Sequence, residues 1–352
     1  MHRRTRVARL FTVAAVAAGL AVAVGVAPAA AAPKGKKLPA TTINGSGATF
    51  PQGYYDQCRE TFTDVQPDLT VNYPNPGGGS GKGRQEFSDE VTQWGASDAP
   101  YKPEDLPSFP FMYIPTVTAP ITVSYNLSGV DDQLRFDPLT LAKIFQGQIT
   151  SWDDPAIAKD NPKVDLPSTS ITIARRSDGS GTTENFTKYL GKAAGSVWTL
   201  GSGSTVNWPA SQGGNGNSGV AAIVQDTDGA IGYVDFSDAK ATGLTFARIQ
   251  NAAGNWVNPS LKAATAALEG TALNQDGLYD PLNSPNEKAY PITAPTWLLV
   301  HESYSDSDTA NAVKAWAEYL LGACQKQAKS VDYAKLPSEW VTQTMARIKT
   351  IS

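Results

Sequence analysis

One short stretch, 175–182, constrains the fold of this chain more than any other, because it joins a strand pattern to a helix pattern through glycine and serine. It reads Arg-Arg-Ser-Asp-Gly-Ser-Gly-Thr. Before it, Ile171 and Ile173 alternate with small or polar residues, which predicts a strand. After it, Phe186 and Leu190 lie four residues apart, the spacing of one helical face. The stretch should therefore form a turn between a strand and the N-terminus of a helix.

Such a turn favours an anion. It presents free backbone N–H groups, and the positive end of the helix dipole points the same way. Gly179 and Gly181 let the backbone approach a ligand closely. Ser180 and Thr182 add hydroxyl donors, and Arg176 adds a forked cation. An ordinary strand–helix turn would also explain this stretch taken alone, but two further loops of the same kind favour anion binding.

The first of these loops lies in the stretch 41–51, where a short strand runs into Gly-Ser-Gly and then a helix. Pro51 falls in the first helical turn, where a missing N–H does no harm. The N–H groups of Thr49 and Phe50, together with the Thr49 hydroxyl, should therefore face the same kind of target as the 175–182 loop.

The second loop lies in the stretch 69–83, where a strand pattern leads through a glycine run to a helix. A nucleotide-binding interpretation fails here, because Gly83 follows Gly81-Lys82 where a P-loop needs Ser or Thr. The spacing of a dinucleotide site is absent as well. What remains is Ser80 at a helix N-terminus, a third cluster of donors.

A carboxylate, Asp98, follows the short strand pattern 94–97. An aspartate in this position usually caps a helix or stabilises a turn. Beside three loops that favour an anion, however, an acid is expected only if it accepts a proton from the ligand.

Two long alternating runs, 116–125 and 291–300, predict strands that carry the chain from one lobe to another and back. Elsewhere strand patterns alternate with helix patterns. We therefore expect an α/β fold with two lobes around a ligand cleft. The first lobe would comprise 40–118 plus 293–352, and the second lobe would comprise 119–292.

The segment 1–31 has the pattern of a secretory signal peptide, with four arginines before an Ala/Val-rich run and small residues after it. Its adjacent arginines leave twin-arginine export open. The run is too weak for a convincing membrane anchor, and no cysteine near the cleavage site could carry a lipid. We expect an exported protein that is extracellular, cell-surface or periplasmic and not lipid-anchored.

Charge and histidine content exclude several classes of function. Removal of the signal peptide leaves 25 Lys and Arg against 33 Asp and Glu, so anion binding must be local and nucleic-acid binding is not expected. Of the two histidines, His2 leaves with the signal peptide and His301 has no companion. No cluster with metal-ligand spacing and no nucleophile elbow is present in the sequence.

The only two cysteines, Cys58 and Cys324, each lie at helical spacing with apolar residues, so both should be buried. In an exported protein such a pair often forms a disulfide. Two inert core thiols are the alternative.

Together, four segments resemble the binding loops of the phosphate-binding protein of bacterial phosphate-specific ABC importers: 46–51, 79–81, 94–100 and 175–182. Three more segments resemble that family in the same chain order: 152–155, 203–209 and 229–234. The resemblance implies a type II periplasmic-binding-protein fold, a clamshell whose lobes are joined by two crossover strands. One dehydrated inorganic phosphate would lie between the lobes.

The resemblance also implies a set of phosphate contacts: Thr49, Phe50, Ser80, Asp98, Arg176, Ser180, Gly181 and Thr182. Asp178 would brace Arg176 from behind. The insertion 74–77 lengthens the loop before Ser80, so Gly79 or Gly81 could share its role. The two cysteines are not part of the family pattern.

By the same resemblance, the protein would be a monomer without cofactor or metal that captures inorganic phosphate and delivers it to ABC permease subunits. Two alternatives stay open. A phosphate-ester hydrolase could use the same loops, but it would need a base or metals. A free extracellular scavenger or sensor would bind phosphate without a permease.

Overall fold

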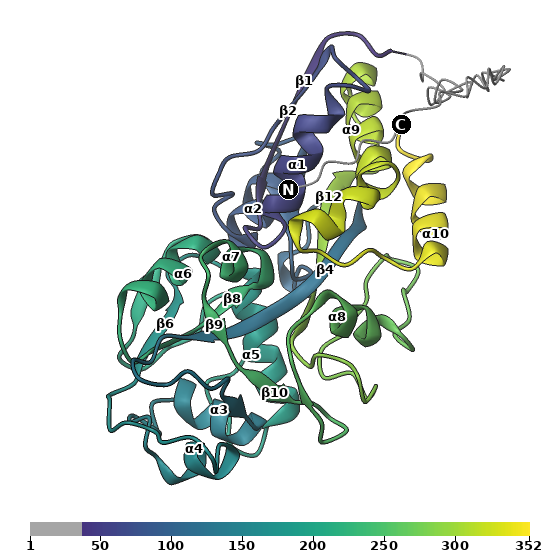
Figure 1. Ribbon diagram of the computed structural model, residues 1–352. Helices are drawn as coiled ribbons and strands as arrows, with labels where there is room; N and C mark the ends of the chain where they lie inside the picture. The colour runs from purple at the N-terminus through teal and green to yellow at the C-terminus, as the bar shows by residue number, and fades with distance from the viewer. Residues whose placement is uncertain (1–36) are drawn as a thin grey trace, which may run out of the picture. The chain divides into compact units, whose positions relative to one another are not determined.

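The structure is a computed structural model that describes residues 37–352 (Figure 1). The predicted signal peptide, 1–31, lies outside the described residues. A long sheet contains most of the strands: β1 (Thr41–Gly47), β2 (Leu69–Asn72), β3 (Trp94–Ser97), β4 (Phe111–Tyr125), β6 (Thr172–Arg176), β7 (Gln212–Gly214), β8 (Ala230–Asp235), β9 (Thr245–Phe246) and β12 (Thr293–His301). A small sheet contains β5 (Arg135–Phe136), β10 (Arg248–Gln250) and β11 (Trp256–Val257).

The long sheet has two halves that share β4, the strand that runs diagonally between them (Figure 1). From Phe111 to Pro120, β4 pairs with β12 in the first half, which continues through β3 and β1 to β2. From Ile121 to Tyr125 it pairs with β8 in the second half, which continues to β6 and β7. The predicted α/β architecture with two lobes is confirmed.

Helices cover both halves. Those that pack with the first half are α1 (Gln52–Phe62), α2 (Ser80–Ser88), α9 (Ser307–Leu321) and α10 (Ser338–Ile348). The intervening chain forms α3 (Pro138–Phe145), α4 (Pro155–Asp160), α5 (Gly181–Ala193), α6 (Gly216–Asp226), α7 (Phe236–Ala241) and α8 (Leu261–Leu268). Short 3₁₀ turns span Pro103–Asp105 and Cys324–Val331.

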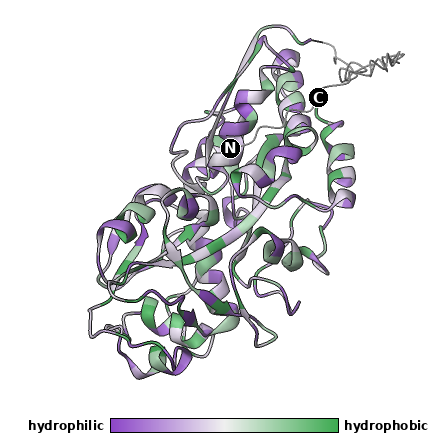
Figure 2. Cartoon of the chain, viewed as in Figure 1, coloured by the Kyte–Doolittle hydropathy of each residue, from purple (hydrophilic) through white to green (hydrophobic). Residues whose placement is uncertain are grey.

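The helices show hydrophobic and hydrophilic residues side by side (Figure 2), as expected where one side packs on the sheet. Within residues 37–352, none is long and apolar enough to cross a membrane.

Residues at the helix ends explain where several helices begin. Asp137 precedes Pro138 and accepts a hydrogen bond from the Thr140 N–H at 2.7 Å, so proline occupies the first turn of α3 and aspartate caps it. Ser180 caps α5 in the same way, through the Thr183 N–H at 3.0 Å. Ser180 is the last residue of the turn before α5. Its hydrogen bond therefore fixes both the start of the helix and the end of the turn.

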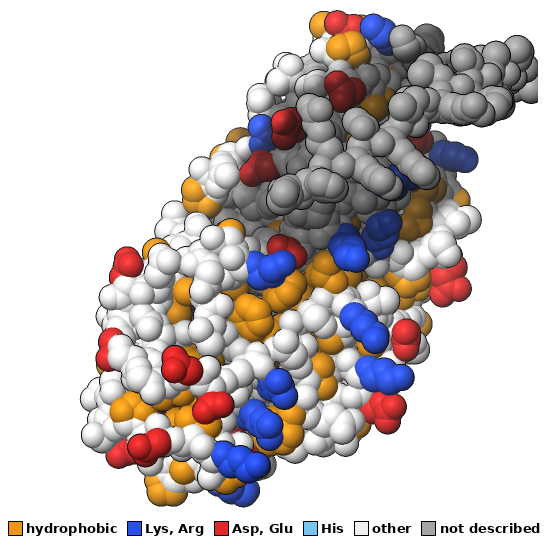
Figure 3. Space-filling view, in the orientation of Figure 1, with side chains coloured by type: hydrophobic (Ala, Val, Ile, Leu, Met, Phe, Trp, Pro, Cys, Tyr) orange, Lys and Arg blue, Asp and Glu red, His pale blue; other side chains and the backbone are white. Residues whose placement is uncertain are grey.

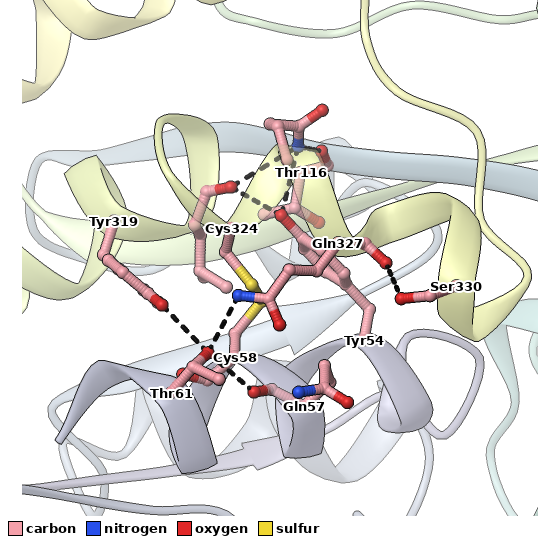
Figure 4. The surroundings of a disulfide bond; sticks show 11 residues. Tyr54, Gln57, Cys58, Thr61, Thr116, Tyr319, Cys324, Gln327 and Ser330 are labelled. Atoms are coloured by element: carbon pink, nitrogen blue, oxygen red, sulfur yellow. Dashed lines mark hydrogen bonds between the residues drawn. A yellow bond between two sulfur atoms is a disulfide. The ribbon is translucent and has the colours of Figure 1, made fainter. Parts of the chain in front are cut away.

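A disulfide between Cys58 and Cys324 joins α1 to the C-terminal part of the first half, with 5.7 Å between the two Cα atoms (Figure 4). Both residues are fully buried. Nearby, the Thr61 hydroxyl oxygen accepts hydrogen bonds from Gln327 at 3.1 Å and from Tyr319 at 2.9 Å. These contacts secure α1, the helix that follows the Thr49 loop.

Candidate functional site

The three glycine–serine loops meet between the two halves of the sheet. The Gly81 N–H, at the start of α2, donates to the Gly179 carbonyl at 2.8 Å. Close packing continues at Gly181, where an added Cβ would lie 2.3 Å from Ser80 Oγ and 2.7 Å from Asp98 Cβ. Only glycine permits this approach of α5 to the opposite loop.

The loop that carries Thr49 joins the same cluster through Asn217, near the start of α6. The Asn217 side-chain amide donates to Thr49 Oγ1 at 3.1 Å and to Thr182 Oγ1 at 3.2 Å. Because Thr182 belongs to α5, this amide connects the 41–51 loop to the 175–182 loop. The structure thus brings together all eight residues that the sequence suggests as ligand contacts, and each of them is buried.

Backbone donors are concentrated at this point. Within residues 37–352, five N–H groups of the cluster have no hydrogen-bond acceptor: Thr49, Phe50, Ser80, Gly181 and Thr182. Three of the five begin α2 or α5, where the first N–H groups of a helix have no intrahelical acceptor. The helix dipoles add partial positive charge at the same place, so the arrangement suits an anion.

The hydroxyl groups of the cluster differ in where their protons can point. Ser180 Oγ accepts the Thr183 N–H at 3.0 Å, which leaves its own proton free to donate. Ser80 Oγ accepts the Asp98 N–H at 3.0 Å and donates to Asp98 Oδ2 at 3.2 Å. The free donor of Ser80 is therefore its backbone N–H.

The neighbouring glycines do not offer an equivalent donor. The Gly79 N–H donates to the Gly47 carbonyl at 2.8 Å, and the Gly81 N–H is used by Gly179. The structure therefore favours Ser80 over the alternative that Gly79 or Gly81 shares its role.

Asp98 is the acid of the cluster. Its Oδ1 accepts a hydrogen bond from the Thr296 hydroxyl at 2.7 Å, and its side chain is fully buried among the loops. Burial raises the pKa of Asp98 to about 7, although the hydrogen bonds from Thr296 and Ser80 and the charges of Arg176 and Arg84 oppose this rise. A carboxyl group with this pKa can hold or release a proton near neutral pH.

The cation of the cluster, Arg176, is paired. Its Nε donates to Asp178 Oδ1 at 2.8 Å, and its Nη2 donates to the other carboxylate oxygen. The Gly216 N–H adds a third hydrogen bond to Asp178, at 3.1 Å. Burial opposes ionisation of Asp178, but the bonds and charge of Arg176 prevail and hold the pKa of Asp178 below its usual value. The positive charge of Arg176 is thus balanced within the protein.

Two buried polar residues of the cluster escape prediction from the sequence. Asn217 lies in a Gly/Asn/Ser-rich stretch, 213–219, whose composition indicates a loop without singling out one residue. Thr296 lies in the alternating run that forms β12, where a threonine looks like an ordinary strand residue. Each forms hydrogen bonds with residues far away in the sequence: Asn217 with Thr49, and Thr296 with Asp98.

Other parts of the protein carry different features. Among residues 37–352, no group of three His, Cys, Asp or Glu side chains could hold a metal ion. His301 stacks on Phe109 with 4.3 Å between ring centroids, and partial burial lowers its pKa. Basic and acidic side chains are interspersed on the face seen in Figure 3. The chain as a whole carries more Asp and Glu than Lys and Arg, so its overall charge does not favour an anion.

Comparisons with known proteins agree on one family. The PBP superfamily domain matches residues 28–323. The chain is 35% identical over 318 residues to the phosphate-binding protein PstS of Pasteurella multocida, covering 88% of this chain and 91% of that protein. It is 33% identical over 327 residues to phosphate-binding protein PstS 3 of Mycobacterium tuberculosis, covering 88% and 87% respectively.

Solved structures share the fold. A high-affinity periplasmic phosphate-binding protein with bound phosphate superposes with a TM-score of 0.69 at 22% identity, covering 87% of this chain and 93% of that one. A putative phosphate ABC transporter substrate-binding protein with bound phosphate from Clostridium perfringens superposes with a TM-score of 0.62 at 17% identity, covering 84% and 100%.

Proposed function

This chain belongs to the PBP superfamily and, within it, to the PstS phosphate-binding proteins; from that premise we propose that it binds one inorganic phosphate between its lobes and delivers it unchanged to an ABC importer. The first lobe comprises 40–118 plus 293–352, and the second comprises 119–292. The phosphate contacts are Thr49, Phe50, Ser80, Asp98, Arg176, Ser180, Gly181 and Thr182, with Asp178 bracing Arg176.

The observation that carries this proposal is the convergence of five buried backbone N–H donors that have no acceptor within residues 37–352. Buried N–H groups are almost always paired, and leaving one unpaired costs about 1–3 kcal/mol. An oxyanion with several oxygens can accept hydrogen bonds from all of them at once. Hydrogen bonds to a charged acceptor are roughly twice as strong as neutral ones.

Asp98 supports phosphate over tetrahedral anions that carry no proton, such as sulfate. An ionised carboxylate only accepts hydrogen bonds, and phosphate near neutral pH still carries a proton to donate. Sulfate carries none, so its oxygen would face the carboxylate oxygen without a proton between them. Arsenate carries the same protons as phosphate and has nearly the same shape, so Asp98 does not discriminate against it.

The proposal includes no catalytic step. Donors that stabilise the oxygens of an anion hold it in place, whereas hydrolysis would also need an activated nucleophile or metals. The signal peptide 1–31 would export the protein, and a monomer in contact with permease subunits would release phosphate to them. Copurification of the protein with a permease would separate importer delivery from free scavenging.

Titration calorimetry tests the binding proposal. Phosphate and arsenate should each bind at one site per molecule. A sugar phosphate should bind far more weakly, because the contact residues are buried and leave little room for a sugar. Absence of phosphate binding would contradict the proposal, and equal affinity for the sugar phosphate would contradict the enclosed site.

A further inference from the structure

Asn217 occupies a position in the cluster that no motif marks. It is the second residue of α6 and is fully buried. Its side-chain nitrogen donates to both Thr49 Oγ1 and Thr182 Oγ1, at 3.1 and 3.2 Å. Its backbone N–H lies 3.4 Å from the same Thr49 oxygen.

A hydrogen bond from Asp235 fixes the orientation of the Asn217 side-chain amide. The side-chain oxygen of Asn217, Oδ1, accepts a hydrogen bond from the Asp235 N–H at 3.4 Å, where β8 ends. An amide has one acceptor end and one donor end. With its oxygen used by Asp235, its NH₂ group must face the two threonines.

A hydroxyl group that accepts hydrogen bonds from its own protein keeps its proton for another acceptor. Thr49 Oγ1 accepts from Asn217, and Thr182 Oγ1 accepts from Asn217 and from Arg176 Nη1 at 3.4 Å. Both hydroxyl protons are therefore directed away from the protein donors. The free N–H groups of Thr49 and Thr182 belong to the same two residues, so N–H and O–H donors are available side by side.

We propose that Asn217 is a positioning residue of the phosphate site, which turns the hydroxyl protons of Thr49 and Thr182 toward the bound anion and joins the two lobes around it. The inference rests on the proposed function. Thr49 lies in the first lobe and Asn217 in the second, so their hydrogen bond forms only when the lobes meet. Loss of Asn217 weakens the donors and removes a contact that holds the lobes together.

The most informative variant is Asn217→Asp, which nearly preserves the shape of the side chain. Its carboxylate accepts protons from the two hydroxyls and so turns them away from the phosphate. Phosphate binding should weaken about 100-fold or more at pH 8, the loss expected for two charge-assisted hydrogen bonds. Because protonation restores a donor, the ratio of variant to wild-type affinity should recover partly at lower pH.

A buried asparagine elsewhere supplies the matched control. Asn251, which is 5% exposed, donates to the backbone carbonyls of Glu287 and Ala289 at 2.9 and 3.1 Å, away from the cluster. Asn251→Asp also buries a carboxyl group, but it should leave phosphate affinity and its pH dependence as in the wild type.

A double-mutant cycle keeps the proposal testable if Asn217→Asp folds poorly. Asn217→Ala should weaken phosphate binding about 10-fold or more in the wild-type background, with the dissociation rate rising more than the association rate falls. In a Thr49→Val/Thr182→Val background the same change should have little further effect, because no hydroxyls remain to be oriented.

Equal losses in both backgrounds, or wild-type affinity for Asn217→Asp at pH 8, would overturn the role of Asn217. Wild-type protein that failed to bind phosphate in the same calorimeter would instead overturn the proposed function itself.

Discussion

The two lobes contribute different chemistry to the proposed phosphate site. The second lobe supplies the N-terminus of α5, the Ser180 hydroxyl and Arg176, whose charge is balanced by Asp178. The first lobe supplies the Thr49 and Phe50 N–H groups and the buried acid Asp98. Donors of the second lobe stabilise any tetrahedral oxyanion, whereas an acid can only accept a ligand that carries a proton. We infer that both lobes contribute to affinity, whereas selectivity comes from Asp98 of the first lobe.

The two acids of the site illustrate this division. Arg176 offsets the burial of Asp178 and lowers its pKa, so Asp178 stays ionised and holds the cation in place. Burial raises the pKa of Asp98 to about 7, and the hydrogen bonds from the Thr296 and Ser80 hydroxyls only partly oppose this rise. Asp178 thus stays ionised and positions Arg176, whereas Asp98 can exchange a proton.

The largest effect expected is on selectivity, from Asp98→Asn. At pH 8 a pKa of about 7 leaves roughly a tenth of Asp98 protonated, so sulfate affinity should rise about 10-fold when the amide offers an N–H instead. Phosphate loses a charge-assisted hydrogen bond in the same variant, so the ratio of phosphate to sulfate affinity should fall about 100-fold or more. Competition binding with both anions measures the ratio, and an unchanged ratio would contradict the role of Asp98.

Arg176→Ala should act on affinity rather than on selectivity. Loss of the guanidinium removes a charge-assisted donor and leaves the Asp178 carboxylate unpaired near the anion, so phosphate affinity should fall about 100-fold. Arg176→Ala/Asp178→Ala, which removes both charges, should lose less, about 10-fold. If the single variant kept wild-type affinity and salt dependence, the site assignment would be wrong.

Gly181→Ala tests how closely the lobes meet. The new Cβ would lie 2.3 Å from Ser80 Oγ and within 2.8 Å of Asp98, so the closed form must shift. Overpacking of this kind costs about 1–3 kcal/mol, which corresponds to a loss of phosphate affinity of about 5- to 150-fold. Gly191→Ala is the matched control on the same helix, because nothing lies within 4 Å of its added Cβ. Gly181→Ala should bind phosphate more weakly than Gly191→Ala. Equal phosphate affinities of the two variants would argue against direct contact between the lobes.

The smallest effect on affinity is expected from the disulfide, which lies within the first lobe. Cys58→Ser/Cys324→Ser should lower the free energy of unfolding by about 2–5 kcal/mol. Once folded, the variant should bind phosphate as the wild type does, since neither cysteine contacts the loops of the site. Thermal melting and calorimetry on the same sample separate the two effects. A large loss of affinity would show that α1 transmits strain to Thr49.

Much of this architecture is predictable because the signals are local. A Gly/Ser turn between a strand and a helix is written in consecutive residues, and the donors of such a turn follow from its geometry. The start of β4 is less visible: the strand begins at Phe111 rather than at 116, and Pro115 lies opposite Trp297, where the register of β12 shifts. Proline is tolerated where the hydrogen-bond ladder is irregular, so a proline in the pattern does not end the strand.

Partners distant in the chain are not predictable in this way. Asn217 contacts Thr49 across 168 residues, and Thr296 contacts Asp98 across 198 residues. No spacing rule connects such pairs. The donation of the Ser80 hydroxyl to Asp98 is likewise visible only in three dimensions, and it changes which atom of Ser80 is free.

Sulfate binding as a function of pH tests the central claim most directly. Sulfate carries no proton between pH 5 and pH 8, so any change in its affinity reports on the protein. At pH 8 most of Asp98 is ionised, and sulfate should be rejected while phosphate binds tightly. As the pH falls through about 7, Asp98 gains a proton and can donate it, so sulfate affinity should rise in the wild type and stay level in Asp98→Asn. Sulfate that binds as tightly as phosphate at pH 8, or with the same affinity at pH 5 and pH 8, would contradict the account.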